Sequence, residues 1–445
     1  MKSLKIDKDW FSNGLEELID RKHDSLRMIF LQNNLRHSAG KGFPFRVKKA
    51  LLTLDESPHS HLEREFIPSE YAERMESAAI YYRYLLTAFK PGFCKIIRAF
   101  SKYEALYHLN PFNKHYRDHE LHQLAVTIIA DKFMTDVNGV FQPDKTSWAD
   151  KISDDIRNKK IPLLHEFTLQ KKFSDMYKLD WFTKNDARYT LGMAALLHDI
   201  GYLFKLPLTM HLDTAGDIFP FLDEKLSLVH SRIKNFLKDS LVCFWFTKQF
   251  KKFYGKEADF EEDVFPWFIA AIQNGNHGAV SCAFLLDHVH EWFSSGDMDT
   301  DNWLCLQWAA LAILRHDLID CKIFCDQTKN SPELWGTPFS EDPISFFLVL
   351  ADNLHESCRH KLDTKITKNK SRTQIESIEP CCYVKISRNS NNLNVKFKFK
   401  PAEKKQSDHV KETCTRIFSP APGPEGKKWR GWAPPAGFAD SIIFI

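Results

Sequence analysis

The sequence of 445 residues lacks most of the motifs that identify common enzyme and binding classes. It contains no Gly-rich phosphate loop and no Gly-x-Ser-x-Gly motif, which argues against a P-loop protein and against an α/β-hydrolase. Its ten cysteines include no Cys-x-x-Cys pair. Because several of them lie in apolar helical runs, we expect reduced thiols in the core and no disulfide framework.

Long apolar runs and a strong charge of one sign are also missing. No segment is apolar over a length that would cross a bilayer, and the first residues lack the apolar centre of a signal peptide. The net charge is only +3, so the chain as a whole has no strong electrostatic attraction to nucleic acid or to a membrane. We therefore expect a cytoplasmic protein without a membrane partner.

Helical patterning dominates what is present. Hydrophobic residues make up 43% of the chain and aromatic residues 13%, which is enough for a sizeable core. The most informative run is residues 191–201, in which Leu191, Ala194 and His198 share one helical face, so that the imidazole points to the core. Gly201 is predicted to end this helix in a left-handed conformation, which places His198 and Asp199 at a helix end.

Three more histidines lie on inner faces or at ends of predicted helices. His122 heads an apolar stripe that continues at Val126, and His277 lies at a break between helices over 267–272 and 279–293. His316 ends the apolar stripe of a further helix. His-Asp pairs also stand at 23–24 and 316–317, and about one such pair is expected by chance, so a doublet alone proves little.

An aspartate completes the pattern. Asp342 as N-cap and Pro343 at the first helical position predict a helix over 344–359, with Asp352 on its buried face. A buried carboxylate without a partner is costly. Inward-facing His and Asp positions on five separate helices together predict a ligand set for one or two cations, which would offset their desolvation. The set is His122, His198 with Asp199, His277, His316 and Asp352.

The order of these residues resembles the HD superfamily of metal-dependent phosphohydrolases. The segments Leu-Leu-His-Asp-Ile-Gly around His198 and Val-Leu-Ala-Asp-Asn-Leu-His-Glu around Asp352 are similar to its motifs, and the likeness covers roughly residues 100–360. The two additional histidines resemble the branch with two metal ions, which includes cyclic-nucleotide and cyclic-dinucleotide phosphodiesterases. The resemblance implies an HD-type helical bundle core. Together with a C-terminal stretch of alternating apolar and polar residues, which predicts a small β-hairpin region, it gives a mainly α fold.

The resemblance also implies a role for each residue. His122, His198, Asp199 and Asp352 would hold the first metal, and Asp199 would bridge to a second metal held by His277 and His316. Catalytic roles are assigned to Asp199 and His119. Neighbouring cationic residues are candidates for binding substrate phosphate, with an ordinary surface role as the competing interpretation: Arg117, Lys205 and Arg315.

Imidazole and carboxylate ligands suit Mn, Fe, Ni, Co or Zn, or Mg if few histidines bind, so the identity of the metal stays open. We predict a hydrolase that cleaves a nucleotide-like phosphoester or phosphoanhydride through a metal-activated hydroxide. The alternative is a non-catalytic regulatory protein that senses a nucleotide or presents its basic C-terminal region to a partner.

Four regions are predicted along the chain: an N-terminal helical subdomain over 1–95, the metal-dependent domain over 96–365, a β-hairpin region over 366–400 and a flexible Pro/Gly-rich tail over 401–445. Residues 143–160 are expected to be a polar insertion. In the hairpin, lysines at 396, 398 and 400 alternate with apolar residues. We interpret them as a solvated edge that resists aggregation, in preference to a nucleic-acid surface.

Overall fold

The computed structural model describes part of the chain, and all structural statements below concern that part. The described residues are 3–6, 115–116, 119–136, 139–141, 145–170, 179–202, 222–273, 276–296, 298, 300–317, 341–356, 361–366, 373–378, 381–389, 392–399, 404–418 and 441–444. Most of the predicted N-terminal subdomain over 1–95, and the candidate substrate residues Arg117 and Lys205, lie outside them.

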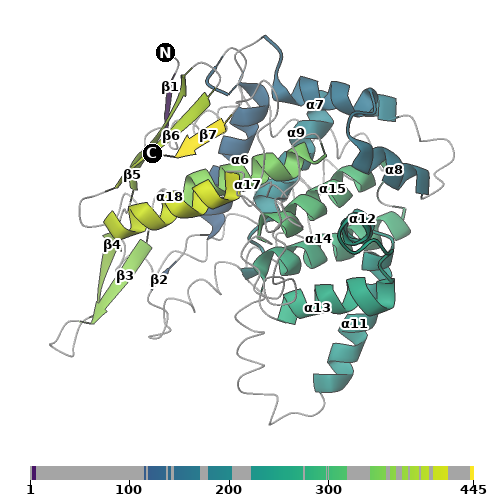
Figure 1. The fold of residues 1–445 in the computed structure, drawn as a ribbon. Helices are drawn as coiled ribbons and strands as arrows, with labels where there is room; N and C mark the ends of the chain where they lie inside the picture. Colours follow the sequence, from purple (N-terminus) through teal and green to yellow (C-terminus); the bar gives the residue numbers. More distant parts are fainter. Residues whose placement is uncertain are drawn as a thin grey trace, which may run out of the picture. The chain divides into compact units, whose positions relative to one another are not determined.

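The chain divides into two compact units. Figure 1 labels its strands and its longer helices. The helical unit comprises Ala130–Leu350 with Thr415–Ile442, and the sheet unit comprises Met1–Ile129, Ala351–Cys414 and Ile443–Ile445. The principal helices are α6 (His119–Thr135), α7 (Trp148–Arg157), α8 (Pro162–Gln170), α9 (Lys184–Leu197), α11 (Leu222–Lys238), α12 (Leu241–Tyr254), α13 (Phe265–Gln273), α14 (His277–Ser294), α15 (Thr300–His316), α17 (Pro343–Glu356) and α18 (Lys404–Phe418). Two short helical turns, η2 (Leu179–Trp181) and η3 (Phe260–Val264), complete the set.

Helix α15 forms the centre of the helical unit. It packs against α9, α12 and α14, and every side chain from Asn302 to His316 is buried. The sequence pattern predicts one buried face, but a helix that is apolar on nearly all sides can be covered on all sides. The last turn of α15 therefore lies inside the unit, and the polar groups of Arg315 and His316 need partners there.

Helix α7 occupies most of the interval predicted to be a polar insertion. Ser147 caps its first turn, accepting a hydrogen bond from the backbone N–H of Asp150. Trp148, Ile152 and Ile156 share one face and are buried, and α7 packs against α9. The interval is polar on average, as predicted, but apolar residues spaced three and four apart give it one packing face. That it is an insertion stays a prediction.

Helix starts around the histidines agree with the sequence patterns. Asn276 caps α14, where its side chain accepts from the N–H of Ala279 at 2.6 Å, so that His277 is the first helical residue after the predicted break. At α17, Asp342 Oδ1 accepts from the N–H of Ser345 at 3.1 Å, which confirms the predicted N-cap.

The sheet unit is built from antiparallel strands. Strands β1 (Ser3–Ile6), β5 (Cys381–Asn389), β6 (Asn392–Phe399) and β7 (Ser441–Phe444) form one sheet in the order β1-β5-β6-β7. Strands β2 (His115–Tyr116), β3 (Lys361–Ile366) and β4 (Thr373–Ile378) form a second sheet in the order β2-β3-β4. Pairing of Asn389 with Asn392 closes the hairpin that the period-two pattern predicts.

The predicted fold class, mainly α with a small β region, is confirmed. Within the region predicted as a flexible tail, helix α18 and strand β7 are formed, because α18 buries Cys414, Ile417 and Phe418 and β7 buries Ile442. No described helix is long and apolar enough to cross a membrane. Four cysteines are free thiols: Cys243, Cys282, Cys305 and Cys414.

Candidate metal centre

His198 and Asp199 follow the last turn of α9, where the apolar stripe of the helix draws both into the interior. Thr183 and Asp186 form a capping box at the start of α9, and from there Leu191 to Leu197 are all buried. His198 has no exposed surface, and Asp199 is 3% exposed. Two ionisable side chains at this depth require partners, since an unpaired buried charge is costly.

Two histidines at helix ends are held in the same way. His198 Nδ1 lies 2.8 Å from the carbonyl of Ala195, and His316 Nδ1 lies 2.5 Å from the carbonyl of Ile313. A carbonyl oxygen can only accept, so each Nδ1 carries the proton and donates it. The Nε2 atom of each ring is thereby left with its lone pair available as a ligand.

His277 is held by a carboxylate instead of a carbonyl. Its Nδ1 lies 2.8 Å from Asp317 Oδ2, and the same oxygen accepts the backbone N–H of Gly278 at 3.2 Å. The side-chain amide of Asn276 donates to the backbone carbonyl of Asp317 at 3.2 Å, which ties the start of α14 to the end of α15. A carboxylate on Nδ1 is the arrangement that orients metal-binding histidines and raises the basicity of Nε2.

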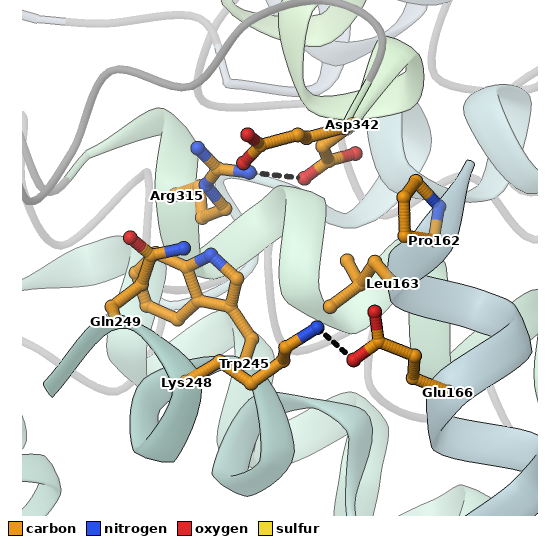
Figure 2. A pocket seen from close by; sticks show the side chains of 9 residues that line it. Pro162, Leu163, Glu166, Trp245, Lys248, Gln249, Arg315 and Asp342 are labelled. Atoms are coloured by element: carbon orange, nitrogen blue, oxygen red, sulfur yellow. Dashed lines mark hydrogen bonds and ion pairs between the residues drawn. The ribbon is translucent and has the colours of Figure 1, made fainter. Parts of the chain in front are cut away.

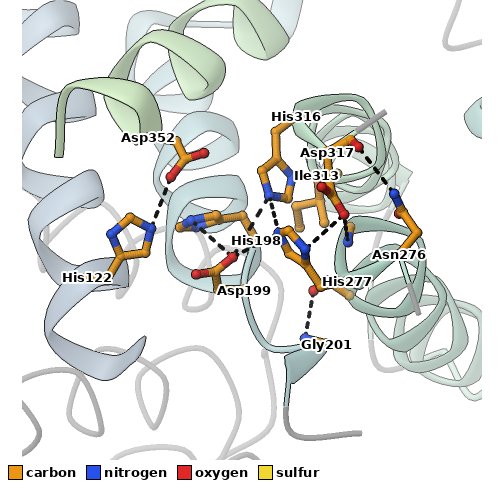
Figure 3. A network of polar contacts seen from close by, with 12 residues as sticks. His122, His198, Asp199, Gly201, Asn276, His277, Ile313, His316, Asp317 and Asp352 are labelled. Carbon is orange, nitrogen blue, oxygen red and sulfur yellow. Dashed lines mark hydrogen bonds and ion pairs between the residues drawn. The ribbon is translucent and has the colours of Figure 1, made fainter. Parts of the chain in front are cut away.

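The Nε2 atoms of three histidines converge on Asp199, as Figure 3 shows. Asp199 Oδ1 lies 3.2 Å from His277 Nε2, 3.9 Å from His316 Nε2 and 3.6 Å from His198 Nε2. The Nε2 atoms of His277 and His316 are 3.1 Å apart. Ligand atoms at about 2.0–2.2 Å from one cation are at most about 4.4 Å apart, and about 3–3.5 Å apart in tetrahedral or octahedral geometry. The donor set of Asp199, His277 and His316 therefore fits a metal ion.

The charges of the cluster follow from its carboxylates. Burial by itself would lower the pKa of His277, but Asp317 and Asp199 together raise it to about 10. Burial would raise the pKa of Asp317, yet the charge and hydrogen bond of His277 hold it below the ordinary value. His277 is therefore a cation in the absence of a metal, and a metal ion must displace its proton.

Glycine at position 201 allows the helix ends to meet. A Cβ atom on Gly201 would lie 2.2 Å from the carbonyl oxygen of His277, and the N–H of Gly201 donates to Ser281 Oγ at 2.7 Å. Positive φ occurs at other glycines and not here, so the prediction of a left-handed helix end is wrong. What the position requires is the absence of a side chain, because the turn after α9 lies against the start of α14. Tyr202 then stacks on the ring of His277, with centroids 4.3 Å apart.

The other two predicted ligands form a pair in the sheet unit. His122 Nε2 lies 3.0 Å from Asp352 Oδ1, and His122 Nδ1 lies 2.7 Å from His355 Nδ1. His122 is 1% exposed, and the side chain of Asp352 is 21% exposed. His355, which the sequence reasoning missed, stands one helical turn after Asp352, and that spacing was the available signal. That this pair shares a centre with the histidines of the helical unit stays a prediction.

Arg315, predicted to bind substrate, does not face the cluster around Asp199. Its Nη1 donates to Asp342 Oδ2 at 2.5 Å, and its guanidinium lies 5.0 Å from the ring centroid of Trp245. These groups line a cavity of about 320 Å³ with Leu163 and the Lys248–Glu166 ion pair, shown in Figure 2. Consecutive helical residues point about 100° apart, so Arg315 does not follow His316 toward Asp199.

Three predicted site residues have side chains outside the described part. His119 is the first residue of α6, but its side chain is not among those described, and Arg117 and Lys205 lie outside as well.

Asp317 is the main functional candidate that the sequence reasoning missed. Its signal was the His316-Asp317 doublet, which looked like a chance occurrence because sequence alone does not show that its carboxylate reaches His277.

No protein-family model, no curated protein and no solved structure matches the chain. The resemblance to the HD superfamily therefore rests on the quoted motifs and stays a prediction. What the structure itself establishes is coarser: buried His and Asp groups in the helical unit are able to hold a metal ion.

Proposed function

We propose that this chain is a metal-dependent phosphohydrolase or phosphodiesterase acting on a nucleotide-like substrate. One observation carries the proposal. His198, His277 and His316 each commit Nδ1 to a fixed acceptor, and each turns Nε2 toward the single oxygen Asp199 Oδ1. A neutral histidine has one donor and one acceptor nitrogen, and a carboxylate cannot donate to the acceptor, so three rings aimed at one carboxylate oxygen leave a common position for a cation.

The residues of the site have distinct tasks in this proposal. Asp199, His277 and His316 hold the metal, His198 adds a fourth donor, and Asp317 orients His277 from behind. A bound divalent cation would act as a Lewis acid toward phosphoryl oxygens, and it would lower the pKa of a bound water to near neutrality. Burial of His198 and Asp199 strengthens every electrostatic interaction at this position, because little water screens it.

The residues proposed to contact the substrate are chosen by their positions in the sequence, next to the predicted ligands. We propose that Arg117 and Lys205 bind phosphate and that His119 protonates the leaving oxygen. Arg315 is not included, because Asp342 already neutralises its guanidinium. His122 and Asp352 are proposed as further ligands, which would give one or two ions among Mn, Fe, Ni, Co, Zn and Mg.

Metal analysis joined to an activity assay tests the proposal. The purified chain is loaded with each metal in turn, its metal content is measured by mass spectrometry, and hydrolysis of bis(p-nitrophenyl) phosphate and of a nucleotide panel is followed. Asp199→Asn and His316→Ala should lose metal and at least about a hundredfold in rate, since each removes a direct ligand. His290→Ala is the matched control, because His290 is an exposed histidine on α14, the helix that carries His277.

The outcomes separate the two functional classes. Stoichiometric metal with turnover that disappears in both variants but not in the control supports the hydrolase. Stoichiometric metal with nucleotide binding and no turnover across the panel would instead favour the regulatory alternative. A wild-type chain that takes up none of the metals overturns both.

A further inference from the structure

The four-stranded sheet has one buried face and one exposed, basic face. Along β5 and β6, Val384, Ile386, Val395 and Phe397 are buried. The residues that alternate with them point to the opposite face by the period-two geometry of strands, and they include Lys385, Lys396 and Lys398, all exposed. Lys5 on β1 is exposed on the same side, since it pairs directly with Lys385.

The strand register places lysines next to one another across the sheet. Lys5 pairs with Lys385, and Lys385 pairs with Lys396, so three ammonium groups form one row across β1, β5 and β6. Directly opposed side chains have Cβ atoms about 4.5–5.5 Å apart, and like charges at that spacing are destabilising. In the described part of the chain, neither Lys385 nor Lys396 forms an ion pair with a carboxylate.

The interpretation of these lysines as protection of a sheet edge is wrong. Lysine blunts an exposed edge by discouraging the pairing of a further strand. In this sheet β5 and β6 are the two inner strands, each hydrogen-bonded on both sides. Their backbone groups already have partners, so the lysines on these strands do not serve that purpose.

An aromatic ring lies in the adjoining row. Tyr383 pairs with Lys398, and its ring centroid is 5.5 Å from Lys398 Nζ and 5.1 Å from Lys5 Nζ. The next outward pair is Ser387 with Asn394, which adds neutral hydrogen-bonding groups. The described outward positions of β1, β5 and β6 thus carry four positive charges, one aromatic ring and no carboxylate.

We propose that this lysine face, defined by Lys5, Lys385, Lys396, Lys398 and Tyr383, binds single-stranded nucleic acid. A closely spaced row of ammonium groups is complementary to a chain of phosphates, which would relieve the repulsion within the row. The face of a four-stranded sheet is too broad to enter a duplex groove, whereas the unpaired bases of a single strand can stack on an aromatic ring. The proposal does not depend on the metal centre or on hydrolysis.

Fluorescence anisotropy with a labelled 20-nucleotide oligo(dT) and the full chain tests the lysine face. The Lys385→Gln/Lys396→Gln double variant should bind at least about tenfold more weakly. The slope of log affinity against log salt should fall by about 1.4, which corresponds to about 0.7 for each phosphate contact on a single strand. Lys145→Gln/Lys256→Gln is the matched control, because it removes the same charge from exposed positions of the helical unit and should change neither quantity.

Two variants of Tyr383 separate stacking from charge. Tyr383→Leu should weaken binding about fivefold or more, and Tyr383→Phe should retain it, since stacking needs the ring and not the hydroxyl. Thermal melting confirms that each variant is folded. Equal losses in the lysine pair and the control pair would overturn the proposal, as would binding to phosphatidylserine vesicles without binding to the oligonucleotide. Metal content and phosphodiester hydrolysis should be unchanged in the lysine variants, so failure here is distinct from failure of the metal centre.

Discussion

Replacing Gly201 by alanine tests whether the contact between two helix ends builds the metal centre. A Cβ atom at this position would lie 2.2 Å from the carbonyl oxygen of His277, and Cβ atoms in proteins essentially never approach another atom within 3.0 Å. The turn after α9 and the start of α14 must therefore separate by about 0.8 Å, the difference between those two distances. The main obstacle is not flexible, because the carbonyl oxygen of His277 belongs to the backbone, and the next nearest atoms, Ser281 Oγ and N, lie at 2.9 and 3.0 Å.

Moving the turn after α9 away from the start of α14 would also move the ligand atoms of Asp199 and His277 apart. Asp199, two residues before Gly201, lies 3.2 Å from His277 Nε2, and a retreat of about 0.8 Å would bring this distance close to the limit of about 4.4 Å that one cation can span. We expect about 1–3 kcal/mol of lost stability from overpacking and metal binding that is at least about tenfold weaker. The measurements are urea unfolding of the metal-free chain and a competition titration against a chromophoric chelator.

Gly255→Ala is the control variant, because it should lower the stability of the chain without changing the metal site. Gly255 has φ of 69° and nothing within 4 Å of the added Cβ, so alanine there costs backbone strain of about 1–2 kcal/mol and causes no clash. It should destabilise the chain to a similar degree and bind metal as the wild type does. The reasoning fails if Gly201→Ala retains wild-type metal affinity, or if both glycine variants lose affinity equally.

Three further predictions follow from the charges and buried pairs of the helical unit. Because the pKa of His277 is raised to about 10 and its proton must leave before a metal binds, metal affinity should rise about tenfold per pH unit between about pH 7 and 9, measured by chelator competition. Asp317→Asn should lower that pKa and flatten the rise, and calorimetry in buffers of different ionisation enthalpy should count fewer protons released at pH 8. Arg315→Met should cost about 3–5 kcal/mol in urea unfolding, because it leaves the carboxylate of Asp342 buried without its cation, while changing metal affinity little.

Much of the local structure could be predicted from the sequence, because periodicity and caps act over a few residues. The inward direction of His198 follows from the apolar residues one and two turns before it, and the start of α17 follows from Asp342 and Pro343. The hairpin of β5 and β6 follows from alternation on both sides of 389–392. In each case the decisive neighbours are near in the chain, and their spacing alone states which way a side chain points.

Other features depended on neighbours that are distant in the chain. Asp317 became a partner of His277 only because the ends of α14 and α15 meet, across a sequence separation of 40 residues. Pairing of β1 with β5 joins the fourth residue of the chain to position 386, and it turns a lysine row on one strand into a basic face. No local pattern shows which distant segments will pack together.

Helical and strand periods, caps and the inward direction of the histidines were set by the sequence, since backbone hydrogen bonding and apolar burial repeat over a few residues. Tertiary packing decided that Gly201 serves close approach instead of a left-handed turn, that Arg315 pairs with Asp342, and that three Nε2 atoms meet one oxygen of Asp199. The physical reason is that ligand geometry depends on differences of a few tenths of an ångström between helix ends, and only the packed core determines those distances.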